Sequence, residues 1–463
     1  MSTVQRIRGH LAAHAFGSVV TLTDLLPPYI RYGYVHRLTR RLFSHPIPAV
    51  QPLAYPSRPQ TSTRPRRAGG GTTCILATDH LDIGGVGSVV EMLSLHLASW
   101  GVEPVVLSPG IGSRAARLQA AGIEVISVSD EVSASVVIGK TNAGVIQLHS
   151  APPFLEDAAV KSGMPVIPVL HNTEIHFTRT RWARFGRTLA RSTCAIAVSE
   201  TVREFHARHV PAELRSRLVV VPNGVPAFPD APAGDSRDHR RRLAELLGTD
   251  LDGAVVFLTL ARYDAQKNVP GTVSSFLRAA ELIETPIYLV VAGEPSDWAE
   301  FRRADGIRRG SRLARRVGLL GNSDATSLLR ASDAFLLNSF FEGWPVAATE
   351  ASAAGLPLLM SDVGGAAELV ALSPGRSVMV PNPSGHAGSV TDARVASARR
   401  RSSRQRNRED IVDAIRTVVD VVLHERERGN AEKSPDRPPS VDDMARGHAE
   451  LIVAATAMAP PRR

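Results

Sequence analysis

The chain has 463 residues, 43% of them hydrophobic and 21% charged, which is the composition of an ordinary globular protein and a length that exceeds one ordinary core. Its two cysteines, Cys74 and Cys194, give neither a disulfide framework nor the spacing of a zinc site, which favours a reducing cytoplasm. The formal net charge of +9 is concentrated in the first 70 residues, which carry ten arginines and one acid. The remainder is neutral on balance, which argues against a nucleic-acid-binding protein.

Residues 1–70 are predicted to be a basic, Pro- and Arg-rich extension, partly disordered, because residues 45–70 are too polar and too rich in proline to pack a core. Such segments are usually solvated. The alternative is a reversible hold on an anionic membrane surface, since each basic residue near one contributes on the order of 1 kcal/mol. No apolar stretch reaches the roughly 18–20 residues of a membrane span. We therefore expect a cytoplasmic protein, either free or peripheral at the inner face of the membrane.

Residues 71–226 alternate short β-rich runs with helix-length stretches, the pattern of a doubly wound parallel sheet. The first run, 73–78, leads into a loop with Gly84, Gly85 and Gly87 and then into a helix. Strand, glycine loop and helix together bring backbone close to a phosphate or a sugar. The third glycine of the dinucleotide fingerprint is missing, so a tight structural turn is an equal alternative.

Two of the predicted strands end in histidine, at His149 and His171. Ligands of open α/β sheets bind outside the carboxyl ends of the strands, so both side chains are candidate site residues. A structural role is the alternative for each. We favour the structural role for His149 and the site for His171.

A polar linker is predicted over 227–252, and the alternation restarts at the apolar run 254–260. This second doubly wound domain is expected to span 253–435. Its first strand is followed at once by Arg262 and Lys267. An Arg guanidinium forks onto phosphate oxygens and a Lys ammonium adds a mobile charge, so this loop is a candidate phosphate site.

The most informative stretch is 340–357, which follows an apolar run predicted to be a buried strand. A helix is expected from about Pro345 and is stopped by Gly355. Glu342 then lies in the loop at the strand's carboxyl end, and Glu350 lies about one and a half turns into the helix. The two carboxylates suit sugar hydroxyls, and the helix amino terminus suits a diphosphate. The alternative is a strand-to-helix turn with two solvated acids.

The order weakens towards the carboxyl terminus. Residues 394–408 hold seven arginines and no acid, which indicates an exposed insertion or flexible loop. A terminal helix is expected over about 441–457. The chain has no His-Glu-x-x-His, no Cys pair at zinc spacing and no Gly-x-Ser-x-Gly nucleophile elbow, so metalloprotease and α/β-hydrolase interpretations find no support.

These motifs taken together resemble glycosyltransferase family 4 (group 1), whose members are retaining, nucleotide-sugar-dependent enzymes of the GT-B fold. The resemblance covers about residues 73–372 and is carried by Gly84-Gly85-Val86-Gly87, His171-Asn172, Val221 to Val225, Arg262 with Lys267, Gly293-Glu294, and Glu342-x7-Glu350 running on to Gly355-Leu356-Pro357. It implies an α/β protein with two doubly wound Rossmann-like domains facing a central cleft. Residues 71–226 would be the acceptor side, with the helix at 441–457 packing back on it, and residues 253–435 would bind the nucleotide sugar.

The resemblance also implies roles for individual residues. Arg262 and Lys267 would meet the donor diphosphate, so that neither a metal nor another cofactor is expected. Glu350 would hold the ribose hydroxyls and Glu342 would contact the donor sugar. By the same carry-over, His171 lies near the transferred sugar.

Four glycines complete the predicted donor-binding set. The loop at Gly84, Gly85 and Gly87 would lie against the diphosphate and the acceptor, and Gly293 belongs to the same set. Two departures from the family pattern are Trp344, where Phe or Tyr is expected, and the small residues of 347–349. Residues 1–70 and 394–408 have no counterpart in the family.

The expected activity is transfer of a hexose, with retention, from a UDP- or GDP-sugar to a lipid-linked or saccharide acceptor, in cell-envelope or exopolysaccharide biosynthesis. The expected partners are the nucleotide-sugar donor, that acceptor and an anionic membrane surface met by residues 1–70, with no nucleic acid. The alternative is a nucleotide-sugar-binding protein without transfer activity, or a sugar-nucleotide epimerase on the same fold. Intact Arg262, Lys267, Glu342 and Glu350 favour the transferase.

Overall fold

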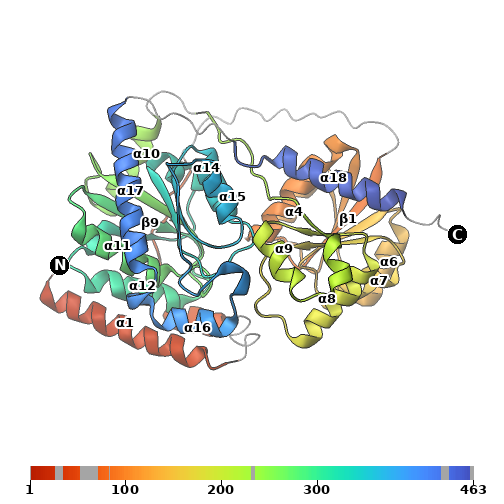
Figure 1. Ribbon diagram of the computed structural model, residues 1–463, viewed down its shortest axis with the longest axis horizontal. Helices are drawn as coiled ribbons and strands as arrows, with labels where there is room; N and C mark the ends of the chain where they lie inside the picture. Colours follow the sequence, from red (N-terminus) through yellow and green to blue (C-terminus); the bar gives the residue numbers. More distant parts are fainter. Residues whose placement is uncertain are drawn as a thin grey trace. The chain divides into compact units, whose positions relative to one another are not determined.

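The computed structural model describes residues 2–26, 35–52, 71–82, 84–230, 235–428 and 437–458. The chain forms two compact units, each built around one parallel sheet (Figure 1). Residues 1–58 and 227–438 make the six-stranded unit, and residues 59–226 and 439–463 make the seven-stranded unit. Among the described helices, none combines the length and apolar character of a membrane span. The predicted α/β class with two doubly wound domains is confirmed.

The seven-stranded unit has the strand order β3-β2-β1-β4-β5-β6-β7, with every neighbouring pair parallel. Its strands are β1 (Thr72–Thr78), β2 (Val102–Ser108), β3 (Glu124–Ser127), β4 (Val145–His149), β5 (Val166–Leu170), β6 (Ala195–Ala197) and β7 (Leu218–Val220). Its helices are α4 (Gly85–His96), η1 (Leu97–Trp100), α5 (Ser113–Ala120), α6 (Glu131–Lys140), α7 (Pro153–Lys161), α8 (Arg179–Arg191), α9 (Glu200–Ala207), η2 (Ala212–Arg217) and α18 (Val441–Ala457). The central strands are buried on both faces, because helices cover both sides of a doubly wound sheet.

The six-stranded unit has the order β10-β9-β8-β11-β12-β13, again all parallel. Its strands are β8 (Val255–Leu260), β9 (Ile287–Ala292), β10 (Val317–Leu320), β11 (Ala334–Leu337), β12 (Leu358–Ser361) and β13 (Val378–Val380). Its helices are α1 (Thr3–Thr23), α3 (Val35–Phe43), α10 (Asp235–Leu247), α11 (Val269–Leu282), α12 (Trp298–Gly310), η3 (Ala314–Arg316), α13 (Ala325–Ala331), α14 (Val346–Ala353), α15 (Ala366–Ala371), η4 (Ala387–Ser389), α16 (Asp392–Arg400), η5 (Ser402–Arg404) and α17 (Arg408–Glu427).

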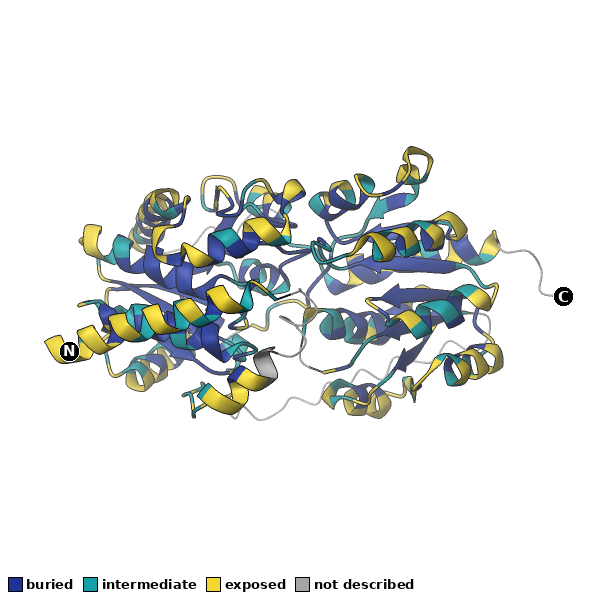
Figure 2. Cartoon of the chain, turned by 90° about the horizontal axis from the view of Figure 1, so that it is seen from below, coloured by how far each residue is buried: buried dark blue, intermediate teal, exposed yellow. Residues whose placement is uncertain are grey.

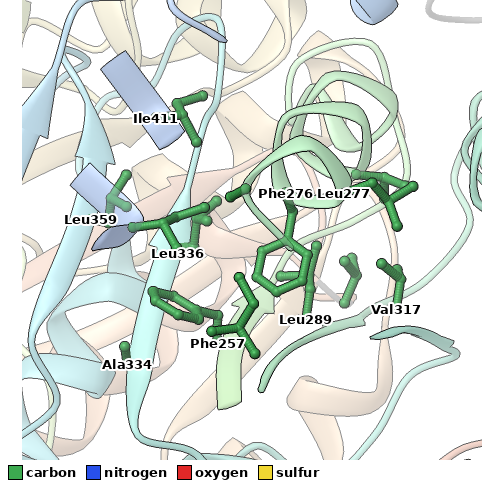
Figure 3. Packing of buried hydrophobic residues seen from close by; sticks show 14 of the residues in the cluster. Phe257, Phe276, Leu277, Leu289, Val317, Ala334, Leu336, Leu359 and Ile411 are labelled. Atoms are coloured by element: carbon green, nitrogen blue, oxygen red, sulfur yellow. The ribbon is translucent and has the colours of Figure 1, made fainter. Parts of the chain in front are cut away.

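The core of the six-stranded unit lies between its sheet and the helices α11, α12 and α17. Phe257 of β8, Phe276 of α11, Leu289 of β9, Leu336 of β11 and Ile411 of α17 meet there with little or no exposed surface (Figure 3). Figure 2 shows the same division along the chain, with buried strands and helices whose outer faces are exposed. Close packing of these apolar side chains supplies most of the stability of such a sheet.

In each sheet the strand order reverses once, between β1 and β4 in the seven-stranded unit and between β8 and β11 in the six-stranded unit. At such a switch point the loops after the two neighbouring strands leave in opposite directions and open a crevice for a ligand. The glycine loop at 84–87 follows β1, His149 ends β4, the loop with Arg262 and Lys267 follows β8, and Glu342 follows β11. The other strand-end candidates, His171 and Gly293, follow the neighbouring strands β5 and β9.

The amino-terminal segment departs from the sequence prediction. Residues 1–70 were expected to be an extension, but α1 and α3 pack on α12 of the six-stranded unit. Residues 48–50 also join the sheet's loops, since Gly321 N–H donates to the Pro48 carbonyl at 2.8 Å and Asp324 N–H to the Val50 carbonyl at 3.0 Å. Residues 53–70, where disorder was also predicted, lie outside the described residues.

Small residues explain why α1 packs. A Cβ added to Gly9 would lie 2.5 Å from the backbone of Arg309, and one added to Gly306 would lie 2.6 Å from the backbone of Ala13. The two helix backbones therefore approach more closely than larger side chains would permit. The sequence signal was the small-residue row Gly9, Ala13 and Gly17, spaced by four, which places all three on one helix face.

The Arg-rich segment 394–408 is also folded, contrary to the prediction of an exposed insertion or flexible loop. It contributes to α16, η5 and the start of α17. Arg399 is buried, with Nη2 2.7 Å from Glu300 Oε1, and it pairs through Nη1 with Asp24 of the residues that follow α1. Asp24, the one acid of residues 1–70, thus forms an ion pair with an arginine more than 370 positions away in the sequence.

Two further segments complete the outline. The predicted polar linker 227–252 contains the helix α10, which packs on α13 and is fixed by Arg240 Nη1, 2.8 Å from Asp333 Oδ2. The linker prediction is therefore corrected for those residues. The terminal helix α18 packs on α4 and η1 within the seven-stranded unit.

Candidate functional site

The loop after β8 carries the two predicted cations, Arg262 and Lys267. Hydrogen bonds to a side chain of the same loop fix its backbone conformation. Asp264 Oδ1 accepts hydrogen bonds from the N–H groups of Gln266 (2.9 Å) and Lys267 (3.0 Å), and Asp264 Oδ2 lies 3.1 Å from Arg262 Nη2. A short Asp side chain that bonds the following backbone in this way shapes a turn. Asn268, with φ of 52°, closes the loop in the left-handed region and begins α11.

Lys267 reaches across the switch point to Glu342 in the loop after β11. Its Nζ lies 2.6 Å from Glu342 Oε1, and Gln266 Nε2 lies 3.1 Å from Glu342 Oε2. The side chains of Lys267 and Glu342 are only 17% and 6% exposed. Because either charge would be costly to bury alone, the two groups hold each other in place. The structure therefore brings Arg262, Lys267 and Glu342 to one edge of the sheet.

Glu350 lies on α14, and the prediction of a helix there with Gly355 past its end is confirmed, with φ of 84° at Gly355. Within the described part of the chain, the Glu350 carboxylate makes no hydrogen bond or ion pair, while burial raises its pKa above the usual range. A partly buried carboxylate with unused acceptor capacity suits a ligand with two hydroxyls. The contrast with the engaged Glu342 was not visible from the sequence.

Gly293 follows β9 and lies directly against the β8 loop. A Cβ at this position would be 2.2 Å from the carbonyl oxygen of Ala261, so only glycine fits. The next residue, Glu294, accepts the N–H of Tyr263 at 3.0 Å through its carbonyl oxygen. The structure thus gives Gly293 a packing role, and its contact with a donor stays a prediction.

Sequence reasoning missed a set of buried amides that support the site from beneath. Asn268 Nδ2 lies 2.9 Å from the Asn338 carbonyl, and Asn268 Oδ1 lies 2.6 Å from Gln405 Nε2. Asn407 Nδ2 lies 3.0 Å from Asn338 Oδ1. The loops after β8 and β11 are therefore tied to the Arg-rich segment 394–408. The polar Gln405 and Asn407 among arginines were the signal.

Sequence reasoning also missed two adjacent glycines, Gly364 and Gly365, which follow β12. Gly364 has φ of 46°, and a Cβ on it would lie 2.2 Å from the carbonyl oxygen of Gly343. A Cβ on Gly365 would lie 2.2 Å from the ring of Trp344. These glycines let the loop after β12 pack against the backbone that carries Glu342. Two adjacent glycines after an apolar run were the available signal.

The glycine loop of the seven-stranded unit begins α4. Gly84 is the residue before the helix, and Gly85 and Gly87 lie in its first turn, with no side chain capping the exposed N–H groups. A Cβ on Gly87 would lie 3.0 Å from the Asp82 carbonyl oxygen. Uncapped N–H groups at a helix amino terminus attract anions. The structure places this loop at the carboxyl end of β1, beside that sheet's switch point.

His171 and His149 belong to one chain of buried polar groups in the seven-stranded unit. His171 Nε2 lies 2.9 Å from His149 Nδ1, and His149 Nε2 lies 3.2 Å from Gln147 Oε1. Gln147 Oε1 also lies 3.1 Å from Nδ1 of His448, a residue of α18. His149 therefore connects the predicted site residue His171 to the terminal helix. Sequence reasoning did not single out Gln147 or His448.

These histidines are neutral at pH 7. Burial lowers the pKa of His171 to about 4 and that of His448 to about 3, and it lowers the pKa of His149 well below its usual range. A neutral imidazole has one donor and one acceptor. With Gln147 Oε1 accepting from His149 and His448, His149 Nδ1 must accept from His171 Nε2. His171 Nδ1 then remains an acceptor for a hydroxyl.

Comparison with known proteins agrees with both units. The family model for glycosyl transferases group 1 matches residues 250–390, and the model for glycosyltransferase family 4 matches residues 83–227. The chain is 29% identical over 153 residues to the UDP-Gal:alpha-D-GlcNAc-diphosphoundecaprenol alpha-1,3-galactosyltransferase of Escherichia coli, covering 32% of this chain and 38% of that protein. It is 31% identical over 222 residues to the putative glycosyltransferase EpsF of Bacillus subtilis, covering 45% and 54%. The chain thus spans about half or less of these curated relatives.

The fold has solved counterparts. The chain matches the crystal structure of Anabaena Alr3699/HepE in complex with UDP with a TM-score of 0.57 and 16% identity, over 83% of this chain and 97% of that one. At this identity the likeness shows the fold alone. The two family models, in contrast, cover the strands, loops and helices that carry the site residues predicted from the sequence. The chain therefore belongs to the group 1, or family 4, glycosyltransferases and has their GT-B fold.

Proposed function

We propose that the protein is a retaining glycosyltransferase that moves a hexose from a nucleotide-diphosphate sugar to a lipid-linked or saccharide acceptor, without a metal. The observation that carries this proposal is the Lys267–Glu342 pair, with Arg262, at the switch point of the six-stranded sheet. Two cations at that edge suit a diphosphate, because Arg binds phosphate oxygens in pairs and Lys supplies a point charge.

The proposed step needs charge stabilisation at the leaving group. The acceptor hydroxyl oxygen bonds to the anomeric carbon on the face from which the diphosphate departs, the bond from that carbon to the diphosphate oxygen breaks, and the hydroxyl proton passes to the leaving phosphate. Negative charge grows on the diphosphate as it departs. Lys267 and Arg262 would meet that charge at positions already fixed by Glu342 and Asp264, so little reorganisation is required.

The two glutamates would divide the donor between them. Glu350 has no partner among the described residues and would accept hydrogen bonds from the ribose hydroxyls. Each oxygen of Glu342 keeps an unused lone pair despite its bonds to Lys267 and Gln266, so it would contact the sugar. UDP-hexoses are the first donors to test, since the Escherichia coli relative is named for UDP-Gal and the Anabaena structure holds UDP.

For the acceptor, the proposal assigns the seven-stranded unit. His171 Nδ1 would accept a hydroxyl hydrogen bond, and the loop with Gly84, Gly85 and Gly87 would offer N–H groups. The diphosphoundecaprenol substrate in the name of the Escherichia coli relative supports a lipid-linked acceptor and a role in envelope or exopolysaccharide assembly.

We propose that the protein works in the cytoplasm at the inner face of the membrane. The support is that exposed apolar residues lie next to basic residues on the amino-terminal helix α3. Leu38 and Leu42 of α3 are more than half exposed next to Arg40 and Arg41. Helices of this kind bind anionic membrane surfaces by apolar burial together with charge attraction.

A thermal-shift titration of the full chain with UDP, GDP and ADP and their hexose conjugates tests the donor site, because a ligand that binds only the folded state raises the melting temperature. We expect one nucleotide to raise it and Glu350→Ala to abolish the shift. Asp420→Ala, which removes an exposed carboxylate on α17, is the matched control and should keep the shift. Release of nucleoside diphosphate with a lipid-linked acceptor then measures transfer. No shift and no release would overturn the proposal in favour of a non-catalytic protein.

A further inference from the structure

A groove of about 670 Å³ lies between α1 and the helices α11 and α12, on the six-stranded unit. Residues 400–408 complete its wall. The Lys267–Glu342 pair lies at the end of the sheet, and neither of its residues lines the groove. Figure 1 shows α1 along the edge of the unit with α12 and α16 beside it.

The groove is strongly basic. The described residues that line it include six arginines, which are Arg6, Arg278, Arg303, Arg312, Arg400 and Arg408. Among the same described residues the one carboxylate is that of Glu281, which lies 3.4 Å from Arg278. Guanidinium groups stay charged at every physiological pH, so this wall carries a fixed positive field inside a hollow that water screens less than an open surface.

Three of these arginines bond to neutral oxygens and not to carboxylates. Arg303 Nη1 donates to the Arg399 carbonyl at 2.8 Å, and Arg408 Nη1 donates to the Ser403 carbonyl at 3.1 Å. Arg6 Nη2 lies 3.4 Å from the Thr3 hydroxyl. The Nε atoms of Arg6 and Arg408 are buried without a hydrogen-bond partner in the described part of the chain. These contacts fix the side chains of Arg6 and Arg408 without a carboxylate partner among the described residues. Arg303 lies near the negative charges of Glu300 and Asp24, and Arg400 Nη1 lies 3.6 Å from Asp24 Oδ2, so the charge of these two arginines is partly compensated.

A cluster in which arginines outnumber the nearby carboxylates matches phosphate. Phosphate oxygens accept paired N–H bonds from guanidinium groups, and each such charge-assisted bond is stronger than a neutral one. A carboxylate ligand would accept the paired N–H bonds of one guanidinium group, whereas a phosphate presents oxygens to several arginines at once. The number of arginines therefore favours a phosphate group.

The other face of α1 points to the source of the phosphate. Val4, Ile7 and Leu11 are 59%, 54% and 65% exposed. Helical spacing places these three on one face, next to the row of Arg6, His10 and His14 that lines the groove and opposite the face that packs on α12. An apolar stripe beside an anion site matches the boundary between the acyl chains and headgroups of a bilayer.

We propose that this groove is a second anion site, distinct from the donor site, and that it binds the phosphate of a membrane phospholipid headgroup while Val4, Ile7 and Leu11 enter the acyl boundary. The proposal rests on the proposed membrane association only for the source of the phosphate. The groove itself is independent of glycosyl transfer, and its test needs no substrate.

The test compares three double variants of the full chain. Arg6→Gln with Arg408→Gln removes two charges from the groove. Arg241→Gln with Arg416→Gln removes two exposed charges of the same unit that lie outside the groove and serves as the matched control. Ile7→Gln with Leu11→Gln removes two of the three apolar side chains of the stripe and leaves every groove arginine in place.

Binding is measured by cosedimentation with vesicles of phosphatidylcholine mixed with phosphatidylglycerol, and the melting temperature is measured with inorganic phosphate. We expect the groove variant to bind vesicles about 30-fold more weakly than the control, from about 1 kcal/mol for each charge. The apolar variant should lose vesicle binding but keep the shift by phosphate. A phosphate shift that the groove variant loses, without vesicle binding by the parent, would support the site with a soluble phosphate as its ligand.

Equal behaviour of the groove variant and the control in both assays would overturn the proposal. In that case, any rise in melting temperature with phosphate would come from the donor site, and any vesicle binding would come from general surface charge. The nucleotide titration of each variant reports separately on the donor site, so a failure of the groove and a failure of the transferase proposal are distinguishable.

Discussion

The two sheets end in polar groups of opposite character. In the six-stranded unit the switch point is crossed by a full ion pair, Lys267 with Glu342, and a second pair, Arg262 with Asp264, lies in the same loop. In the seven-stranded unit a chain of neutral hydrogen-bonding side chains runs from His171, after β5, through His149 and Gln147 of β4 to His448 of α18. Both arrangements are fixed before any ligand binds, but only the first carries charge.

The difference follows what each side is proposed to bind. A departing diphosphate gains negative charge, and only fixed positive charge stabilises that gain. A sugar and an acceptor hydroxyl are neutral when they bind, and an imidazolium buried beside them would be costly because burial penalises the charged form. Fixed positive charge is therefore placed where negative charge grows, and neutral hydrogen bonding where neutral groups bind. Four predictions test this division.

The largest expected effect comes from the lysine. Lys267→Met should lower kcat by about 100- to 1,000-fold, the usual cost of losing one group that stabilises charge in the transition state. Binding of the nucleotide sugar should change less, because the charge is needed most as the diphosphate leaves. Steady-state kinetics, with release of nucleoside diphosphate as the readout, measures both quantities.

Removing the lysine also leaves Glu342 buried without its partner, which alone is destabilising by about 3–5 kcal/mol. The double variant Lys267→Met with Glu342→Gln separates the two causes. If the cation acts on the diphosphate, the double variant regains stability but stays slow. Recovery of kcat in the double variant would show that the unpaired carboxylate caused the loss, and that the lysine has no direct role.

The second effect concerns the free carboxylate. Glu350→Gln should weaken donor binding by about 10- to 150-fold, since a hydrogen bond to a charged group is worth about 1.5–3 kcal/mol. Calorimetry with the nucleotide alone measures this. If Glu350→Gln weakened binding of the corresponding 2′-deoxynucleotide by the same factor, the proposed ribose contact would be contradicted. The affinity of a ligand that lacks this hydroxyl should depend little on Glu350.

Whether a feature of this site could be predicted from the sequence depends on how far apart in the chain the contacting residues lie. The strand end before Glu342, the helix that carries Glu350 and its stop at Gly355 are local features, written in an apolar run, small residues and one glycine. These could be predicted because backbone sterics and helix capping act over a few residues. The cations after β8 were predictable for the same reason.

The pairings could not be predicted, because they join distant segments. Lys267 and Glu342 are 75 positions apart, and Asp24 and Arg399 are 375 positions apart. Charge counting failed for the amino-terminal segment, because ten arginines suggested solvation while the glycine row of α1 decided the packing. A count of charges gives no information on which face of a helix bears them.

The third prediction uses acid to test the neutral chain. The pKa of His448 is lowered to about 3 in the fold and should be about 6.5 when unfolded, so the unfolded state binds more protons between those values. Stability of the seven-stranded unit is thus complete above pH 6.5 and falls as the pH falls towards 3. Each such histidine contributes about 1.4 kcal/mol per pH unit below 6.5.

Urea unfolding at a series of pH values measures that slope. His448→Gln should make it shallower by about 1.4 kcal/mol per pH unit, whatever its effect on stability at pH 7.5. His424→Gln, on α17 of the six-stranded unit, is the control for the loss of a histidine elsewhere in the chain. An unchanged slope in His448→Gln would mean that His448 is already charged in the fold.

The smallest effect is expected from His149, which we infer to position His171 and not to touch a substrate. Gln reproduces the reach of an imidazole Nε2 and Asn that of Nδ1, so His149→Gln keeps the contact with Gln147 and loses His171, whereas His149→Asn does the reverse. A hydrogen bond of about 0.5–1.5 kcal/mol predicts a 2- to 10-fold lower kcat for His149→Gln and partial rescue by His149→Asn. KM for the donor should stay constant in both, because the proposed nucleotide contacts of Arg262, Lys267 and Glu350 lie in the six-stranded unit. Equal activity of the two variants, with equal losses of melting temperature, would give His149 a structural role alone.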